Sequence, residues 1–229
     1  MAAGDWSGRE AGAVVLPGAL RAGLGMVAGV AVLVVGVLGG MYAGHGRPGR
    51  VDAWVQPAVE GVGPGWRHVA LGLDFLGEPL GSVLLVGAVV VGCLLLWGSR
   101  ASVFVVACVC VAVGVATLLK YVVGRTIHGD GNLSYPSGHT AFFTALVFAL
   151  ALIVAGRLGL GRTAGTLLVL ASALVAGAAM GWAQVALGAH YPTDVLGGWC
   201  TALAVVPATA WLIDRTADRA ADARPLVRR

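Results

Sequence analysis

Two histidines stand where apolar stretches of the sequence begin, and the residues around them are suited to phosphate chemistry. His190 lies two residues before Pro192, and proline suits the first turn of a helix. Asp194 lies within that first turn, four residues after His190. This spacing lets the carboxylate accept a hydrogen bond from one imidazole nitrogen, so that the other nitrogen presents its lone pair outward. An imidazole oriented in this way is a nucleophile or a base.

The second histidine, His139, belongs to the stretch YPSGHT. Pro136 ends an extended loop, and Ser137 and Gly138 then offer a hydroxyl and backbone N–H groups at the N-terminus of a helix, where the helix dipole favours an anion. Gly138 also allows a ligand to approach the backbone closely. His139 would stand beside the bound anion and could donate a proton to it.

Fixed positive charge comes from Lys120 and Arg125, which precede this stretch by less than twenty residues. A phosphate group needs such charge and a neutral substrate does not. The two histidines and the two cations therefore predict a site for a phosphate group at one surface of a membrane.

The elements that position these residues are predicted to be transmembrane helices. The chain has 229 residues, of which 58% are hydrophobic and 11% charged, a composition far from that of a soluble globular domain. Apolar runs of this length satisfy their backbone hydrogen bonds internally as helices, whereas barrel strands would be shorter and alternating. We expect an all-α six-helix membrane bundle with spans at 22–43, 79–97, 101–119, 140–156, 163–187 and 195–213.

The distribution of Lys and Arg predicts the orientation. With both termini inside, five of the 15 basic residues face outward, namely Arg47, Arg50, Arg67, Lys120 and Arg125, and the others face inward. The site therefore faces the extracytoplasmic side of the cell membrane. The net charge of +4 reflects this excess of basic residues on the inner face. The expected partners are therefore a lipid substrate and the bilayer, and nucleic acid is not expected to bind.

Residues 1–21 and 214–229 are predicted to be cytoplasmic flanks of a single membrane domain, 22–213. A cleaved signal peptide is the competing interpretation of the first span, but the apolar stretch is too long and too far from the N-terminus for an ordinary one. Two pairs of glycines suggest where helices touch, Gly36 with Gly40 and Gly177 with Gly181.

The long outer connection, 44–78, contains one predicted amphipathic helix. Its apolar positions are Trp66, Val69, Ala70, Leu73 and Leu76, and its polar face carries Arg67, His68 and Asp74. This short interfacial helix is a lid, an anchor or a simple packing element.

The motifs resemble those of the type-2 phosphatidic acid phosphatase superfamily, the lipid phosphate phosphatases. The resemblance runs from about Asp52 to Ile213, and its most specific parts are PSGH at 136–139 and the pair His190 and Asp194 within LGAHYPTDVLGG. It implies that His190 is the nucleophile that forms a phosphohistidine, that Asp194 orients it, and that His139 protonates the leaving oxygen. It further implies phosphate binding by Lys120, Ser137 and Gly138, with no cofactor.

The sequence departs from the family pattern at two positions. The family's first motif is Lys, six residues, then Arg-Pro, and Ile127 and His128 occupy those last two positions. The third motif usually opens with Ser-Arg, where this chain has Ala183 and Gln184. Arg125 is expected to supply part of the missing charge, and Gln184 is expected to donate hydrogen bonds to the substrate. Because two customary arginines are absent, we expect the site to bind a dianionic phosphate more weakly than other family members do.

The predicted function is removal of a terminal phosphate from a lipid phosphate or diphosphate, without a metal. Undecaprenyl diphosphate is the favoured substrate, and phosphatidic acid or phosphatidylglycerol phosphate is the alternative. A catalytically impaired member that binds lipid phosphates, and phosphoryl transfer to an acceptor other than water, remain open. A metal site built from His139, His190 and Asp194 is disfavoured by the basic residues beside it.

Overall fold

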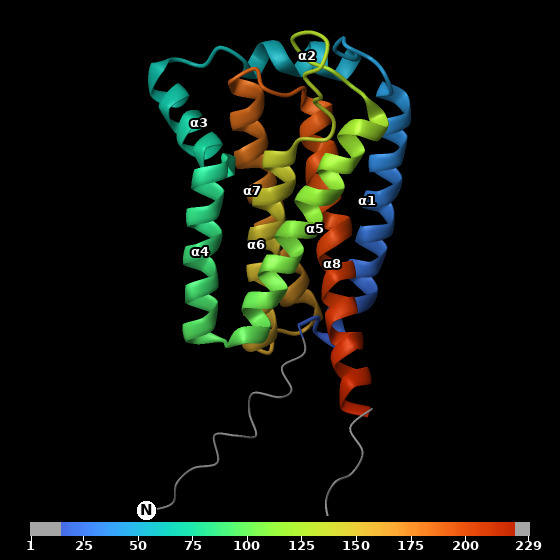
Figure 1. Ribbon diagram of the computed structural model, residues 1–229, viewed down its shortest axis with the longest axis vertical. Helices are drawn as coiled ribbons and strands as arrows, with labels where there is room; N and C mark the ends of the chain where they lie inside the picture. The colour runs from blue at the N-terminus through green and yellow to red at the C-terminus, as the bar shows by residue number, and fades with distance from the viewer. Residues whose placement is uncertain (1–14, 223–229) are drawn as a thin grey trace, which may run out of the picture.

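The structure, a computed structural model that describes residues 15–222, is a bundle of long helices (Figure 1). A 3-10 turn, Gly18–Leu20, leads into the first helix. The helices are α1 (Arg21–Tyr42), α2 (Arg50–Val59), α3 (Pro64–Gly77), α4 (Pro79–Leu96), α5 (Ser99–Val123), α6 (Gly138–Arg157), α7 (Arg162–Ala186) and α8 (Pro192–Asp222).

The predicted all-α bundle with six spans is confirmed. Six helices, α1 and α4 to α8, are long and apolar enough to cross a membrane. The last of them does not end at Ile213, because α8 continues without a break to Asp222. The division into flanks 1–21 and 214–229 around a domain 22–213 stays a prediction, and residues 1–14 and 223–229 lie outside the described residues.

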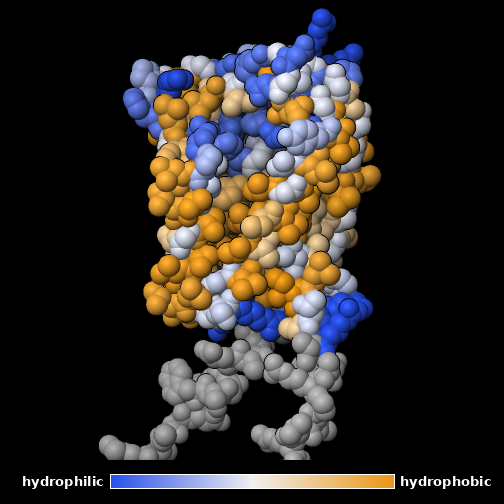
Figure 2. All heavy atoms as spheres, in the orientation of Figure 1, coloured by the Kyte–Doolittle hydropathy of each residue, from blue (hydrophilic) through white to orange (hydrophobic). Residues whose placement is uncertain are grey.

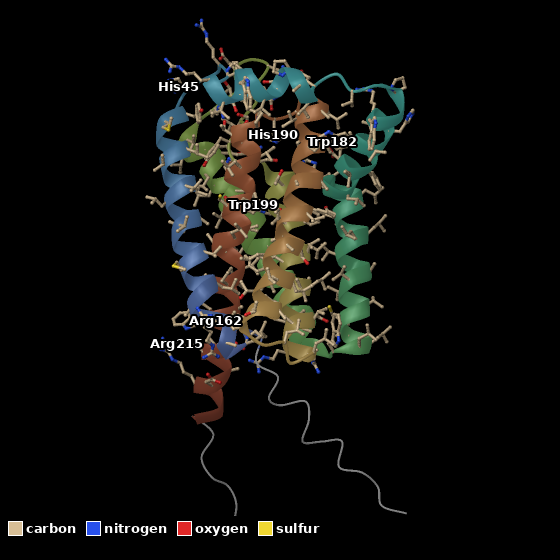
Figure 3. All side chains as sticks on the ribbon, turned by 180° about the vertical axis from the view of Figure 1, so that it is seen from behind. His45, Arg162, Trp182, His190, Trp199 and Arg215 are labelled. Carbon is tan, nitrogen blue, oxygen red and sulfur yellow. The ribbon has the colours of Figure 1, made fainter. Side chains whose placement is uncertain are left out.

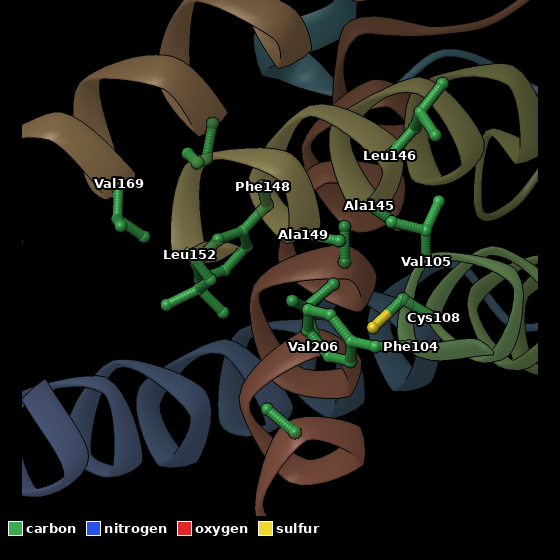
Figure 4. Close-up of a cluster of buried hydrophobic side chains, with 14 of the residues drawn as sticks. Phe104, Val105, Cys108, Ala145, Leu146, Phe148, Ala149, Leu152, Val169 and Val206 are labelled. Carbon is green, nitrogen blue, oxygen red and sulfur yellow. The ribbon is translucent and has the colours of Figure 1, made fainter. Parts of the chain in front are cut away.

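The centre of the bundle is α6, which contacts α5, α7 and α8. In its most apolar window 67% of the residues are buried, against 11% in α4, which lies at the periphery. Phe148 and Leu152 of α6 pack with Phe104 of α5 and Val206 of α8 in the apolar core (Figure 4). The helix that begins at PSGH is therefore held from three sides, which fixes the position of its first turn.

Close helix contact through glycine occurs between α7 and α8. A Cβ atom on Gly177 would lie 2.2 Å from the Trp199 ring, and one on Gly181 would lie 2.2 Å from Val195. Both predicted contacts of this pair are confirmed. The prediction for Gly36 and Gly40 is wrong, since no heavy atom lies within 4 Å of a Cβ at either position. No neighbouring helix packs closely against these two glycines, so a four-residue spacing of glycines does not by itself identify a helix contact.

The connection from α1 to α4 contains two helices where the sequence predicted one. Helix α2 lies across one end of the bundle, and α3 slopes from that end down to α4 (Figure 1). Apolar periodicity missed α2 because its one buried residue is a carboxylic acid, Asp52. The predicted helix corresponds to α3, but of its apolar face only Ala70 is buried, and Trp66 packs edge-on against Trp182 of α7.

The two ends of the bundle differ in what they carry. The end covered by α2, called the α2 end below, holds His45, Trp182 and His190, whereas Arg162 and Arg215 lie near the opposite end (Figure 3). Residues 15 and 222, the limits of the described chain, also lie at that opposite end (Figure 1). An apolar band separates the two ends (Figure 2).

The predicted orientation leads to a labelling experiment. Asp130, in the loop at the α2 end, and Gly161, between α6 and α7, are both exposed. In right-side-out vesicles we expect a membrane-impermeant maleimide to label Asp130→Cys directly and Gly161→Cys only after permeabilisation. The chain without an added cysteine is the control, because Cys110 is itself exposed on the bundle surface. The reverse labelling pattern would show that the α2 end faces the cytoplasm.

Candidate active site

The predicted site residues come from three segments that meet at the α2 end. Lys120 lies in the last turn of α5, His139 in the first turn of α6, and Asp194 in the first turn of α8. His190 is in the loop just before α8 and is nearly buried. His139 lies within electrostatic range of both His190 and Lys120. The fold thus gathers groups that are more than seventy residues apart in the sequence, such as Lys120 and Asp194.

The carboxylate of Asp194 stands beside His190, as the spacing predicted. Asp194 Oδ2 lies 3.7 Å from His190 Nδ1 and accepts the backbone N–H of Tyr191 at 3.1 Å. The imidazole contact is a few tenths of an ångström longer than a hydrogen bond, and the buried Nδ1 has no other partner among the described residues. The second ring nitrogen, Nε2, makes no hydrogen bond within the described part of the chain.

Asp194 is itself held by Arg125, which is completely buried. One guanidinium nitrogen of Arg125 donates to Asp194 Oδ1 at 2.6 Å and to Thr193 Oγ1 at 2.6 Å. The other donates to Asp52 Oδ2 at 2.6 Å. Tyrosine rings lie on the guanidinium at 3.9 Å and 4.4 Å, where cation–π attraction adds to the ion pairs, and they belong to Tyr42 and Tyr191.

This placement changes the role expected for Arg125. A guanidinium that is enclosed by two carboxylates and two aromatic rings has no surface to offer a substrate phosphate. Arg125 contacts Asp194, which stands beside His190, and its guanidinium is not open to a ligand. The second carboxylate belongs to Asp52, a residue that sequence reasoning missed, which accepts one hydrogen bond from the guanidinium at 2.6 Å.

Asp52 ties α2 to the start of α8. Its Oδ1 accepts the backbone N–H of Thr193 at 2.9 Å, and its Oδ2 accepts the Thr193 hydroxyl at 3.0 Å and the backbone N–H of Gly49 at 2.9 Å. A wholly buried carboxylate is stable only with such a set of donors. No local signal marks Asp52 as a site residue, because Arg125 and Thr193, which tie it to the site, are more than seventy residues away.

Ser137 and Gly138 form the start of α6. Ser137 is the N-cap, and its hydroxyl oxygen accepts the Thr140 hydroxyl at 3.0 Å and the Thr140 backbone N–H at 3.4 Å. Its own backbone N–H donates to the carbonyl of Asp194 at 2.9 Å, which joins the two helix starts. The serine side chain is buried, so anion binding here falls to the first-turn N–H groups of Gly138 and His139, which helix geometry leaves without an intrahelical partner.

Lys120 is half-buried and its ammonium group donates to the carbonyl of Leu133 at 2.9 Å. An ammonium carries three N–H donors, so this bond leaves two for a phosphate. The contact also ties the end of α5 to the loop that precedes PSGH. Lys120 is the fixed cation that the structure leaves nearest to His139, since Arg125 is neutralised by its carboxylates.

Gln184 faces a residue that the sequence had assigned to the solvent. Its buried side-chain amide donates to Asp74 Oδ1 at 2.8 Å, and the same oxygen lies 3.5 Å from His139 Nε2. The prediction that Asp74 belongs to the polar outer face of its helix is wrong, because α3 slopes against α7 and turns this residue toward the site. The amide of Gln184 is thereby engaged with a carboxylate, where the sequence predicted contact with the substrate.

One group of potential metal ligands occurs among residues 15–222, and it differs from the trio considered in the sequence. The ligand atoms of Asp74, Glu78 and His139 lie within 4.8 Å of one another. Asp74 already accepts a hydrogen bond from Gln184, and Lys120 adds a neighbouring positive charge. These features oppose cation binding, and the absence of a metal from the reaction stays a prediction.

Two tyrosines close the site toward the bundle. Burial raises the pKa of Tyr135, whose hydroxyl donates to the carbonyl of Val35 in α1 at 2.8 Å. Burial also raises the pKa of Tyr191, although Arg125 acts in the opposite direction. Both phenols therefore stay neutral donors near neutral pH and fix the loops that carry PSGH and His190.

A polar hollow lies between two helices at the α2 end (Figure 2). Helices α4 and α5 are joined at the opposite end of the bundle and diverge toward the α2 end (Figure 1). Where they diverge, hydrophilic residues are set back between apolar flanks (Figure 2). A polar recess flanked by lipid-facing apolar surface suits a ligand with a charged head and an apolar tail.

Comparison with known proteins gives two matches. A family model described as the PAP2 superfamily matches residues 101–217, which run from α5 into α8 and include every predicted site residue. The crystal structure of the first transmembrane PAP2 type phosphatidylglycerolphosphate phosphatase from Bacillus subtilis aligns with a TM-score of 0.62 at 17% sequence identity. The alignment covers 87% of this chain and 98% of that chain. The comparison with curated protein sequences gives no match.

The buried network around Arg125 leads to a stability prediction. We expect Arg125→Gln to lower the free energy of unfolding by about 3–5 kcal/mol, because it leaves two carboxylates without their cation. Arg50→Gln, an exposed arginine at the start of α2, should change it by less than about 0.5 kcal/mol. Denaturant unfolding followed by circular dichroism in detergent measures both. Equal effects of the two substitutions would contradict the structural role assigned to Arg125.

Proposed function

The chain belongs to the PAP2 superfamily, and on that premise we propose that it is a membrane phosphatase that removes the terminal phosphate of a lipid phosphate or diphosphate. The observation that supports this most directly is the meeting of His139, His190 and Lys120 at one end of a membrane bundle, beside a recess with apolar flanks. Two imidazoles and a cation around one space suit phosphoryl transfer.

The proposed reaction begins with attack of His190 Nε2 on the terminal phosphorus. The nitrogen lone pair forms the N–P bond while the bond from phosphorus to the leaving oxygen breaks, and the leaving oxygen takes a proton from His139. Asp194, 3.7 Å from Nδ1, stabilises the positive charge that develops on the His190 ring. Water then attacks the phosphohistidine, which releases inorganic phosphate and restores the imidazole.

The terminal phosphate would be held by Lys120 and by the first-turn N–H groups of α6. Asp194, Thr193 and Arg125 act behind His190 and keep the ring in place. The apolar part of the substrate would approach from the outer leaflet between α4 and α5. This arrangement lets the headgroup reach the site while the tail stays in lipid.

Two substrates are proposed for the first tests. Undecaprenyl diphosphate is the substrate favoured in the sequence analysis. Phosphatidylglycerolphosphate is the second, because the Bacillus subtilis protein with a similar fold is named as its phosphatase. Each carries a terminal phosphate on a membrane-anchored molecule, so both suit a recess at the membrane boundary.

A second candidate function is binding of lipid phosphates without turnover. Ile127 and Gln184 occupy the positions where the family customarily has arginines, and both are buried. Gln184 donates to Asp74, so neither position adds positive charge to the site. Transfer of the phosphoryl group to an acceptor other than water is a variant of the first proposal, and labelled substrate would distinguish the two by the product that carries the label.

Substitution of the nucleophile tests the proposed hydrolysis. His190→Ala should lower phosphate release from either lipid in detergent micelles by at least about 10³-fold, since the covalent step is lost. His45→Ala, an exposed histidine at the same end, is the matched control and should keep full activity. Circular dichroism checks that both variants are folded. Binding of lipid phosphate by the wild-type chain without phosphate release would favour the second candidate.

Metal independence has its own measurement. Phosphate release by the wild-type chain should be undiminished in excess chelator, because Lys120 and the protonated His139 supply the positive charge. A loss that added divalent cation restores would show that Asp74, Glu78 and His139 bind a metal during the reaction.

A further inference from the structure

We infer that Asp74, at the end of α3, is a positioning residue for His139 and makes with it a second histidine–carboxylate pair opposite that of His190 and Asp194. The inference rests on the proposed function and assigns the origin of the proton that the leaving oxygen receives. Neither Asp74 nor the α3 helix lies within residues 101–217 that the family model matches.

The carboxylate of Asp74 contacts side chains of two other helices, α6 and α7. Its Oδ1 lies 3.5 Å from His139 Nε2, a distance at which an imidazolium and a carboxylate form an ion pair. The same oxygen accepts the amide of Gln184 at 2.8 Å, and Gln184 is 1% exposed. Helix α7 thus fixes Asp74, and Asp74 in turn fixes the ring of His139. The nearby Glu78 is farther from Nε2, at 3.9 Å, and its side chain is 53% exposed.

Gly77 brings the end of α3 against the imidazole ring. A Cβ atom at this position would lie 2.1 Å from His139 Cδ2 and 3.0 Å from Nε2, far closer than atoms in contact can approach. The helix end therefore forms a wall along the edge of the ring that carries Nε2. Rotation of the ring toward α3 is blocked, and the edge with Nδ1 is left to face the space near His190 and Lys120.

The charges around His139 come from every element packed against it. Asp74 and Glu78 on the α3 side are negative, Lys120 on α5 is positive, and the His190 ring precedes α8. Lys120 repels a positive charge on His139. Asp74 favours the imidazolium, and it is the charged group with a fixed position close to the ring.

The proton transfer then follows from the two ring nitrogens. In the imidazolium, the N–H at Nε2 faces Asp74 and the N–H at Nδ1 faces the leaving oxygen. As the bond from phosphorus to that oxygen breaks, its electron pair takes the proton from Nδ1, whose N–H electrons become a lone pair on the neutral ring. The Nε2 proton stays on the ring toward Asp74, so the same tautomer is ready to accept a proton from the hydrolytic water.

The experiment compares substrates that differ in their need for this proton. Asp74→Asn should slow phosphate release from phosphatidylglycerolphosphate, which has an alcohol leaving group, by about 10²-fold or more. Release from p-nitrophenyl phosphate, whose phenolate leaves without protonation, should fall by less than about threefold on the same reasoning. Asp74→Glu should restore part of the loss, and Glu78→Gln is the matched control that removes a nearby charge with little effect on either ester.

Gly77→Ala tests the same idea without changing a charge, in case Asp74→Asn does not fold. The added methyl group should displace the His139 ring and reproduce the selective loss on the alcohol ester. Gly72→Ala, in the same helix with no heavy atom within 4 Å of its added Cβ, is the control and should leave both rates unchanged.

Equal losses on both esters in Asp74→Asn and Gly77→Ala, or no loss on either, would overturn the inference and leave the proposed function intact. A wild-type chain that releases phosphate from neither ester would overturn the inference, and one that also releases none from undecaprenyl diphosphate would overturn the proposed function with it. A loss confined to the alcohol ester supports both.

Discussion

A single buried cation holds the α2 end of this bundle together. Arg125 has no exposed surface, and its neighbours are two carboxylates, a threonine hydroxyl and two aromatic rings. Removing such a charge from water is costly, and here two carboxylates and a threonine hydroxyl that accept hydrogen bonds at 2.6 Å offset the cost. Because Asp52 and Asp194 come from α2 and α8, the network specifies how a surface helix, a loop and a transmembrane helix meet. The position of His190 depends on that meeting point.

The second imidazole is positioned by packing and by the start of a helix. His139 begins α6, the helix with the largest buried share of the bundle, and Ser137 links that start to α8 through the carbonyl of Asp194. At Gly198 in α8, a Cβ would lie 2.3 Å from the carbonyl oxygen of Ser137, so the two helix starts approach at backbone distance. The two histidines are therefore mounted on rigid elements joined by main-chain contacts, as a site with a defined geometry requires.

The site contains carboxylates beside its cationic groups, so it is not simply a cluster of positive charges. The arginine nearest to the histidines is neutralised, Gln184 faces a carboxylate, and Asp74 stands beside His139. A phosphate bound as proposed above would draw positive charge from Lys120, from the start of helix α6 and from a protonated imidazole. The surface helices that precede the matched family region contribute directly to this balance, because Asp52 and Asp74 both belong to them.

The sequence by itself determined the six spans, the helix starts at PSGH and at Pro192, and the pairing of His190 with Asp194. These follow from apolar runs and from spacings within one helical turn, which are local properties of the chain. Only the tertiary structure decided that Arg125 faces Asp52 instead of a ligand, and that Asp74 turns from the solvent toward His139. Each of those partners lies more than sixty residues from the group it contacts. In both cases a surface helix carries a carboxylate that faces the protein, wholly buried at Asp52 and partly exposed at Asp74. Apolar periodicity registers hydrocarbon surface but not the distant partners that hold such a carboxylate.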